Sequence, residues 1–162
     1  MIDPRHPDFT NTPASPQRPV CAYRPADPSA SPCVSIITPF FNTGDEFQET
    51  IRTVFEQSLQ QWEWIIVNDA TTRPASLAML DELRGTDPRI RIIDHPENRG
   101  LSAARNTGWR AARSAMIVLL DSDDLLEPTS VEKWFWHLAT FPEHAFVKGF
   151  GIGFGAREYL WQ

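Results

Sequence analysis

Apolar positions recur along the chain in two alternating patterns. Short runs rich in β-branched residues predict strands buried on both faces of a sheet. Between these runs, apolar residues spaced three or four positions apart predict helices that cover the sheet. The strands are expected at 34–38, 62–69, 89–95 and 115–121, and the helices at 47–59, 74–85, 98–114 and 128–140.

Four successive strand–helix units predict an α/β fold with a mostly parallel sheet flanked by helices. Pro39 is expected to end the first strand, and 115–121 is expected to be a buried central strand. The glycine-rich stretch 144–155 predicts a fifth strand or the start of a hairpin. The small residues of 98–114 predict a helix that packs closely on the sheet.

Polar clusters follow three of the predicted strands, namely "TPFFN" at 38–42, "NDATT" at 68–72 and "DSDD" at 121–124. Parallel strands present their carboxyl ends at one edge of the sheet, and ligands of such sheets bind there. We therefore expect the three clusters to lie together and to form a site.

The first 32 residues differ in composition, because they hold more than half of the 14 prolines. They predict an extended or disordered arm, followed by a globular domain over 33–162. Cys21 and Cys33 match no metal motif, and no disulfide is expected, which favours a cytoplasmic location. No apolar run is long enough for a membrane helix, and no signal peptide is expected.

The net charge is −6 and the pI is about 5.1. This balance argues against a nucleic-acid partner, which selects a basic surface. It does not argue against a nucleotide, which backbone groups and a metal can bind in a small pocket.

The acidic cluster carries the most specific chemistry. Asp121 and Asp123 stand two positions apart after a strand, so both carboxylates can point to the same side. Mg²⁺ or Mn²⁺ prefers such oxygen ligands and often shares them with a diphosphate. The alternative at this point is a set of solvated or helix-capping aspartates.

Two further candidates remain open on residue type alone. Asp69 can accept hydrogen bonds from a base or a ribose, or can simply form a turn. Arg99, Gly100 and Arg105 stand at a helix entrance, which favours phosphate binding, although basic residues on an amphipathic helix also occur without a ligand.

In this order, "VSIITPFFN", "IIVNDATT", "NRGLSAARNTG" and "LLDSDD" resemble the N-terminal half of a family 2 glycosyltransferase. The resemblance covers roughly residues 33–140. It implies the GT-A fold and a nucleotide-sugar-binding portion whose acceptor half is largely missing, so the domain is expected to be truncated.

The resemblance also implies roles for individual residues. Metal binding falls to Asp123 and Asp121, with Asp124 as an auxiliary acid. The donor-binding residues are expected to be Thr38, Pro39, Phe41, Asp69, Arg105 and Asp121. The sequence departs from the family pattern at Phe41, where Tyr is usual, at Asn68, where an acid is usual, and at Ala70, where Gly is usual.

The implied reaction transfers a sugar, with inversion, from a nucleoside-diphosphate sugar to a hydroxyl group. A UDP-sugar is the favoured donor, a glycan or lipid-linked molecule is the expected acceptor, and polysaccharide biosynthesis is the expected context. The cofactor is Mn²⁺ or Mg²⁺. The chain is expected in the cytoplasm or at the inner face of the membrane.

The catalytic base is expected in the second half of the family's domain, and neither Glu143 nor Glu158 stands in a recognisable base motif. An alternative is therefore a catalytically incomplete module that binds nucleotide sugars. A receiver-like signalling domain is a weaker alternative, because that fold needs acids after the first strand and "TPFFN" has none.

Overall fold

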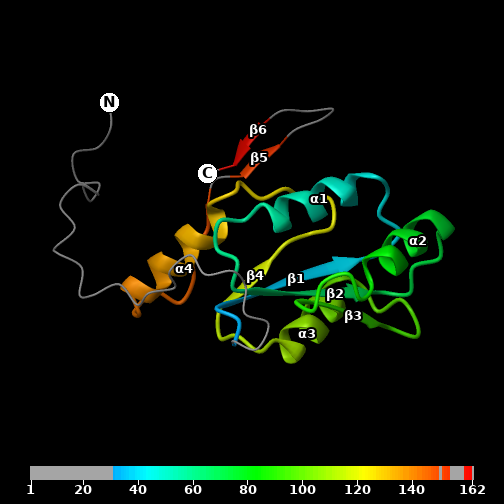
Figure 1. The fold of residues 1–162 in the computed structure, drawn as a ribbon, viewed down its shortest axis with the longest axis horizontal. Coiled ribbons are helices and arrows are strands. Elements are labelled where there is room, and N and C mark those ends of the chain that lie inside the picture. The colour runs from blue at the N-terminus through cyan, green and yellow to red at the C-terminus, as the bar shows by residue number, and fades with distance from the viewer. Residues whose placement is uncertain (1–30, 150, 154–158, 162) are drawn as a thin grey trace.

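The computed structural model describes residues 31–149, 151–153 and 159–161. The expected arm at 1–32 therefore lies almost wholly outside the described residues, and so does Cys21. The predictions of an extended or disordered arm and of no disulfide between Cys21 and Cys33 stay untested. The elements, labelled in Figure 1, are β1 (Val34–Phe40), α1 (Glu46–Phe55), β2 (Trp62–Asn68), α2 (Pro74–Leu83), β3 (Ile90–Asp94), α3 (Leu101–Ala111), β4 (Ile117–Leu119), α4 (Ser130–Thr140), β5 (Gly151–Gly153) and β6 (Tyr159–Trp161).

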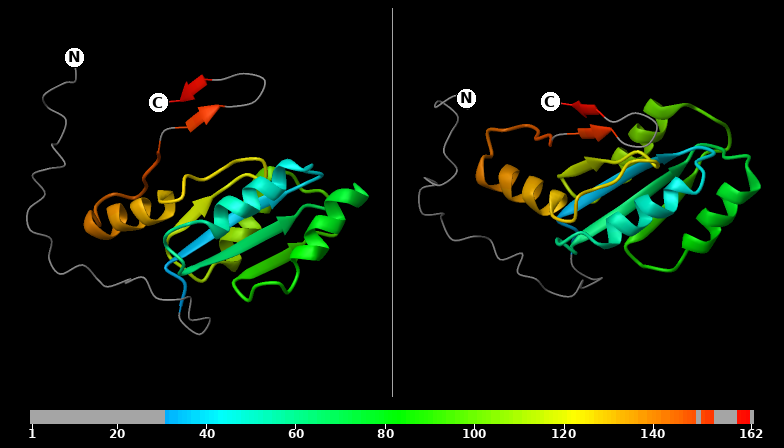
Figure 2. Two further views of the ribbon diagram at one scale, coloured as in Figure 1. Left: turned by 45° about the horizontal axis from the view of Figure 1, so that its top comes forward. Right: turned by 90° about the horizontal axis from the view of Figure 1, so that it is seen from above.

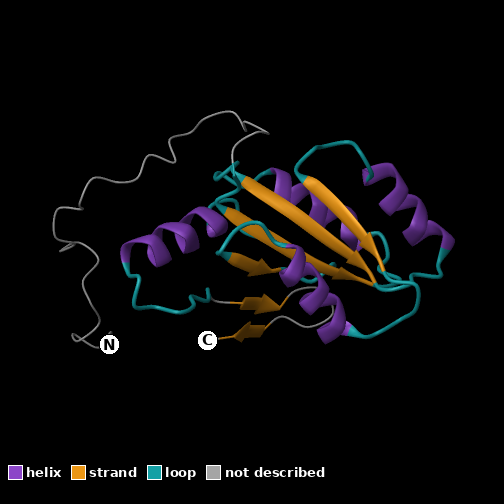
Figure 3. Cartoon of the chain, turned by 90° about the horizontal axis from the view of Figure 1, so that it is seen from below, coloured by secondary structure: helices purple, strands orange, loops and turns teal. Residues whose placement is uncertain are grey.

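Strands β1 to β4 form one sheet in the order β3-β2-β1-β4, and each neighbouring pair is parallel. Figure 3 shows the four strands pointing in one direction. This arrangement confirms the predicted parallel α/β sheet. Strands β5 and β6 pair antiparallel in a separate hairpin, which Figure 2 shows apart from the sheet, so the expected hairpin in 144–155 is also confirmed.

The larger part of the core lies on the face of the sheet that α1 covers. Trp64 and Ile66 of β2 pack here with Phe47 and Val54 of α1. Apolar residues of α2 and α4 join the same cluster. Because side chains alternate along a strand, the residues between these point to the other face, which α3 covers (Figure 1).

Helix α3 lies very close to the sheet. Ala104 is fully buried with Ile65 and Val67 of β2. A Cβ atom added at Gly108 would clash with the side chain of Ile37 in β1. The prediction of a small-residue helix packed closely on the sheet is therefore confirmed, because only hydrogen fits at this contact.

Pro39 does not end β1, so that prediction was wrong. The strand continues to Phe40, and Pro39 stands opposite Val67 in the register with β2. The backbone of Ile37 bonds toward β4, where its carbonyl accepts from Leu120, and alternation gives Pro39 the same direction. Pairing with β4 ends at Ile37, so no neighbouring strand needs the N–H that proline lacks.

The prediction of a buried central strand at 115–121 was also wrong. Strand β4 has three residues, stands at the end of the described strand order, and leaves Leu119 55% exposed. Its apolar side chains line an open cleft of about 710 Å³ together with Trp134 and Phe135 of α4. An apolar run in the sequence indicates contact with other apolar groups but not where these groups lie. Here part of that contact is with α4, beside the strand.

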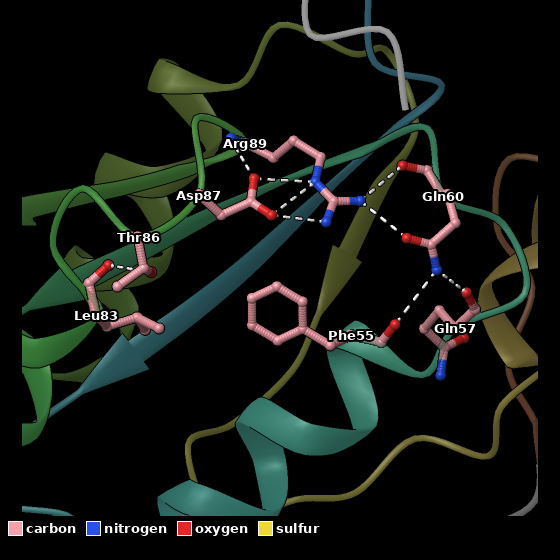
Figure 4. A network of polar contacts seen from close by, with 7 residues as sticks. All are labelled: Phe55, Gln57, Gln60, Leu83, Thr86, Asp87 and Arg89. Atoms are coloured by element: carbon pink, nitrogen blue, oxygen red, sulfur yellow. Dashed lines mark hydrogen bonds and ion pairs between the residues drawn. The ribbon is translucent and has the colours of Figure 1, made fainter. Parts of the chain in front are cut away.

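Figure 4 shows how Arg89 ties the loop before β3 to the start of β2. Its guanidinium bonds both oxygens of Asp87 and two oxygens of Gln60, and it lies 3.7 Å from the centre of the Trp62 ring. Hydrogen bonds from Arg89 hold the pKa of Asp87 below its usual range. This network fixes the amino-terminal edge of the sheet, far from the strand ends where a ligand is expected.

Glu63 of β2 is a fully buried acid inside an apolar run. One oxygen accepts from the Ser35 hydroxyl and the Arg113 backbone N–H, and the other from the guanidiniums of Arg113 and Arg91. Burial alone would raise the pKa of Glu63, but the hydrogen bonds from Ser35 and Arg113 outweigh it and lower this pKa. Glu63 therefore joins β1, β2 and the loop after α3.

No helix in the described part of the chain is long and apolar enough to cross a membrane.

Replacing Glu63 tests this buried junction. Glu63→Gln is expected to lower the free energy of unfolding at pH 7 by about 3 kcal/mol, because buried donors lose their ionic acceptor. The folded pKa lies below the unfolded value of about 4.3, so the charge stabilises fully above that value and less as pH falls through the folded pKa. The difference between variant and wild type should therefore shrink in urea unfolding curves recorded from pH 7 to pH 3.

The matched control is Glu82→Gln at an exposed position of α2, where we expect a change within about 0.5 kcal/mol. A difference at Glu63 that stayed constant with pH would contradict the proposed role of its charge.

Candidate functional site

A cleft of about 480 Å³ opens at the carboxyl ends of β1, β2 and β4. Its volume is in the range of pockets that bind small molecules, roughly 300–1,000 Å³. Each of the three polar clusters contributes residues to the lining of this cleft, which confirms the prediction that they lie together. The lining residues are Pro39, Phe40, Phe41, Asp69, Asn98, Gly100, Leu101, Ala104, Asp121, Ser122 and Asp123.

Asp69 stands directly after β2 and is only 3% exposed. Its Oδ1 accepts from the backbone N–H of Arg99 at 2.9 Å and lies 2.6 Å from His95 Nδ1, while its Oδ2 accepts from the Gly100 N–H at 2.7 Å. Burial would raise the pKa of Asp69, but the hydrogen bonds from Arg99, His95 and Gly100 lower it below the usual value. The cleft is therefore lined by an ionised carboxylate held by the entrance of α3.

The loop after β2 is held by amide side chains. Asn68 is buried, accepts from the Thr71 N–H and donates to Asp94, so a carboxylate at position 68 would face the charge of Asp94. Asn42 accepts from the backbone N–H groups of Thr72 and Arg73. The contact of Asn68 with Asp94 gives a physical reason for an asparagine at position 68, where the family usually has an acid.

Two residues near this loop have left-handed backbones without being glycine. They are Asn42, with φ of 54°, and Ala70, with φ of 59°. Asparagine tolerates this region, whereas alanine is strained by about 1 kcal/mol or more. A glycine at position 70 would adopt the same backbone without strain, so alanine forms this turn at an energetic cost.

The first acid of the "DSDD" loop is paired with an arginine. Both oxygens of Asp121 accept from Nη2 of Arg105, at 2.6 and 2.8 Å, and both side chains are about one-third exposed. Asp123 is exposed and lines the cleft. Partial desolvation, together with the charges of Asp121 and Asp123, raises the pKa of Asp124, which is an exposed residue and lines the apolar cleft beside β4 instead. The three acids thus have three different environments.

Polar residues on α1 and just after its end hold the backbone that carries these acids. The hydroxyl of Thr50 donates to the carbonyls of Ser122 and Asp124, at 3.1 and 2.9 Å. One turn on, the Thr53 hydroxyl accepts from the Leu126 N–H, and Gln57 bonds the Glu127 carbonyl and the Val131 N–H. These buried bonds fix the chain from the acidic loop to the start of α4.

Not every residue expected at the site lines the cleft. Thr38 is fully buried beneath it, and its hydroxyl accepts from Trp64 Nε1 at 2.8 Å. Arg105 reaches the site through Asp121, and its Nε is a buried donor with no partner among the described atoms. Pro39, Phe41, Asp69, Asp121 and Asp123 do line the cleft.

Sequence reasoning missed three contributors. Asn98 lines the cleft, His95 contacts Asp69, and Thr50 holds the acidic loop. The i, i+3, i+7 spacing of Thr50, Thr53 and Gln57 was available as a signal, because it places three polar side chains on one helix face. Nothing in the sequence alone indicates that this face is buried.

The acids can be tested against the needs of a divalent cation. In the described part of the chain no three His, Cys, Asp or Glu residues gather as a metal-binding group. Asp121 and Asp123 supply two carboxylates, and Mg²⁺ commonly takes one or two from the protein and the rest from phosphates and water. The residues therefore fit a cation shared with a phosphate ligand, and they do not form a cage complete in itself.

Comparison with known proteins identifies a family and several similar sequences. The family model described as "Glycosyl transferase family 2" matches residues 35–161. A putative teichuronic acid biosynthesis glycosyltransferase, TuaG of Bacillus subtilis (strain 168), is 36% identical over 102 residues, which cover 63% of this chain and 40% of TuaG. Chondroitin synthase of Pasteurella multocida (strain Pm70) is 37% identical over 101 residues, which cover 62% of this chain and 10% of the synthase. The chain thus spans less than half the length of these relatives.

The fold is shared with a solved structure, that of S. aureus TarS 1–349 in complex with UDP-GlcNAc. The TM-score is 0.59 at 19% sequence identity, and the match covers 65% of this chain and 31% of TarS 1–349. The parallel sheet flanked by helices agrees with this likeness, so the GT-A fold expected from the sequence is confirmed.

Thr50 provides a test of how the acidic loop is held. Thr50→Val keeps the shape of the side chain but leaves two carbonyls without their donor, so we expect a loss of about 1–2 kcal/mol in the free energy of unfolding. Thr140→Val makes the same change at an exposed position in α4 and should shift stability by less than about 0.5 kcal/mol. Equal urea midpoints for the two variants would show that the Thr50 bonds do not stabilise the loop.

Proposed function

The chain belongs to glycosyl transferase family 2, and from this premise we propose that its cleft binds a nucleoside-diphosphate sugar for transfer to an acceptor hydroxyl with inversion. One observation carries the proposal. Asp69, the entrance of α3 and the "DSDD" loop come from three distant parts of the chain and line one cleft of suitable volume.

In this proposal the nucleobase lies beside Pro39 and Phe41, and Asp69 accepts a hydrogen bond from it. Phe41 is 48% exposed, so its ring is available for contact with a flat ligand. Oδ2 of Asp69 accepts one hydrogen bond, from the Gly100 N–H, and a carboxylate oxygen can accept a second. A ring N–H of uracil or guanine is a suitable donor.

The diphosphate is assigned to the space between α3 and the acidic loop. The first turn of α3 has no side-chain cap, which leaves backbone N–H groups at the positive end of the helix dipole. Arg105 contributes a guanidinium, the side chain best suited to phosphate oxygens. A divalent cation held by Asp123 and Asp121 supplies further positive charge to the leaving group when it is bound.

Transfer is proposed as a single displacement. The acceptor oxygen forms a bond to the anomeric carbon on the face opposite the nucleotide, and the bond to the diphosphate oxygen breaks with its electron pair. The acceptor proton passes to a base. The three carboxylates that line the cleft are Asp69, Asp121 and Asp123, and all three are given to the donor, so none of them is assigned as the base.

A uridine nucleotide is the first ligand to test, since the solved structures of TarS 1–349 contain UDP or UDP-GlcNAc. Titration calorimetry of the 162-residue chain with UDP and with GDP, each with and without Mn²⁺, is expected to show metal-dependent binding. Asp123→Ala should weaken that binding by about 100-fold, because it removes the exposed carboxylate ligand. Asp81→Ala on the surface of α2 removes an acid outside the cleft and should leave the affinity unchanged.

Metal-dependent binding that survives Asp123→Ala would overturn the assignment of the cation to this residue. If neither nucleotide binds, with or without Mn²⁺, the proposal of a donor site is wrong.

The second candidate is a module of the same fold that binds nucleotide sugars without transferring them. It is favoured by the lining of the cleft, because the carboxylates found there among the described residues are Asp69, Asp121 and Asp123, the same three that the proposal uses for the donor. Release of UDP from UDP-glucose, UDP-galactose and UDP-GlcNAc, in the presence of Mn²⁺, separates the two. We expect the catalytic chain to release UDP at a rate above that of its Asp123→Ala variant, whereas a binding module gives the same background rate for both.

A further inference from the structure

His95 is a buried histidine that the proposed function does not use. It lies directly after β3, is 7% exposed, and does not line the cleft. Its Nδ1 is 2.6 Å from Oδ1 of Asp69, and its Nε2 is 2.8 Å from the hydroxyl of Thr107 on α3. Both ring nitrogens therefore have partners, and the ring lies between the end of β2 and α3.

The direction of these hydrogen bonds follows from Asp69. An ionised carboxylate can only accept, so Nδ1 of His95 carries a proton and donates to Oδ1. In the neutral ring Nε2 is then the acceptor, and the hydroxyl of Thr107 donates to it. Asp69 thus selects the tautomer with the proton on Nδ1, and Thr107 holds the other side of the ring by donating to Nε2.

The two carboxylate oxygens of Asp69 accept different numbers of hydrogen bonds. Oδ1 has two partners, His95 and the N–H of Arg99, whereas Oδ2 has the N–H of Gly100 alone. The pair of bonds on Oδ1 fixes the rotation of the carboxylate about its last side-chain bond. Oδ2 is left with acceptor capacity, and Asp69 is one of the residues that line the cleft.

We propose that His95 is a positioning residue for nucleobase selectivity. Resting on the proposed function, this role is to hold the Asp69 carboxylate so that Oδ2 accepts from a base that carries a ring N–H. Uracil has such a hydrogen at N3 and guanine has one at N1. Cytosine and adenine have a bare acceptor nitrogen at the matching position, which an ionised carboxylate repels.

The role differs from simple stabilisation of the fold. Loss of general stability lowers the binding of all nucleotides by a common factor. Without His95 the carboxylate keeps only the N–H groups of Arg99 and Gly100 and is held less firmly, which weakens both the bond to uracil and the repulsion of cytosine, so the ratio of the two affinities falls. Selectivity is therefore the readout that separates the two explanations.

The test uses the 162-residue chain with Mn²⁺ and titration calorimetry against UDP, CDP, GDP and ADP. His95→Leu fills the site without a donor, and we expect the UDP/CDP affinity ratio to fall about tenfold, the usual effect of losing one hydrogen bond to a charged group. If the wild-type chain prefers GDP, the same fall is expected in its GDP/ADP ratio. His95→Asn places an amide N–H near the position of Nδ1 and should restore most of the selectivity.

Thr107→Val is the second variant, because it removes the hydroxyl that holds Nε2 of the ring while keeping the side chain's shape. We expect a smaller fall in the ratio, of about threefold, on a folded chain. If His95→Leu does not fold, the affinity ratio of Thr107→Val still tests the proposed role of His95.

The outcomes are distinct. An unchanged ratio in His95→Leu and Thr107→Val, or no recovery in His95→Asn, overturns the role of His95 and leaves the donor site intact. A wild-type chain that binds none of the four nucleotides overturns the proposed function itself.

Discussion

Two buried carboxylates, one within β2 and one directly after it, hold the two ends of α3. Glu63, near the start of the strand, accepts from the Arg113 N–H just after the helix, and Asp69, just past the end of the strand, accepts from the Arg99 and Gly100 N–H groups just before it. Both are ionised in surroundings that disfavour charge, because the donors around them outweigh the cost of burial. The helix is therefore fixed along the sheet at both termini, and its close contact at Gly108 has a defined position.

The placement of α3 determines the cleft. Its entrance forms one wall, and Arg105, one turn further along, pairs with Asp121 of the acidic loop. The opposite side of that loop is held by Thr50 of α1, from the other face of the sheet. Each wall thus depends on a different helix, and the parallel pairing of β1 with β2 and β4 brings the strand ends to one edge.

Periodicity in the sequence predicts the type and order of the elements well, because burial of apolar surface determines them. It fails where the same apolar signal serves different contacts. The run at Met116–Leu120 reads as a central strand but lies at the edge of the described sheet, beside α4. Among the site residues, type and spacing identify Asp69, Asp121 and Asp123 as cleft residues. They do not reveal the buried partners His95 and Thr50, because a polar residue carries no mark of whether its partner is water or protein.

In the acidic loop, the negative charge of Asp121 is already neutralised by Arg105 of the same chain. A metal ion that took Asp121 as a ligand would have to displace the Arg105 guanidinium from its carboxylate. Because the guanidinium is part of the chain, its positive charge would stay beside the cleft and add to the charge of the metal ion. In the proposed donor site, binding of the metal cation and binding of the diphosphate anion are therefore expected to be thermodynamically linked, so that each increases the affinity of the site for the other.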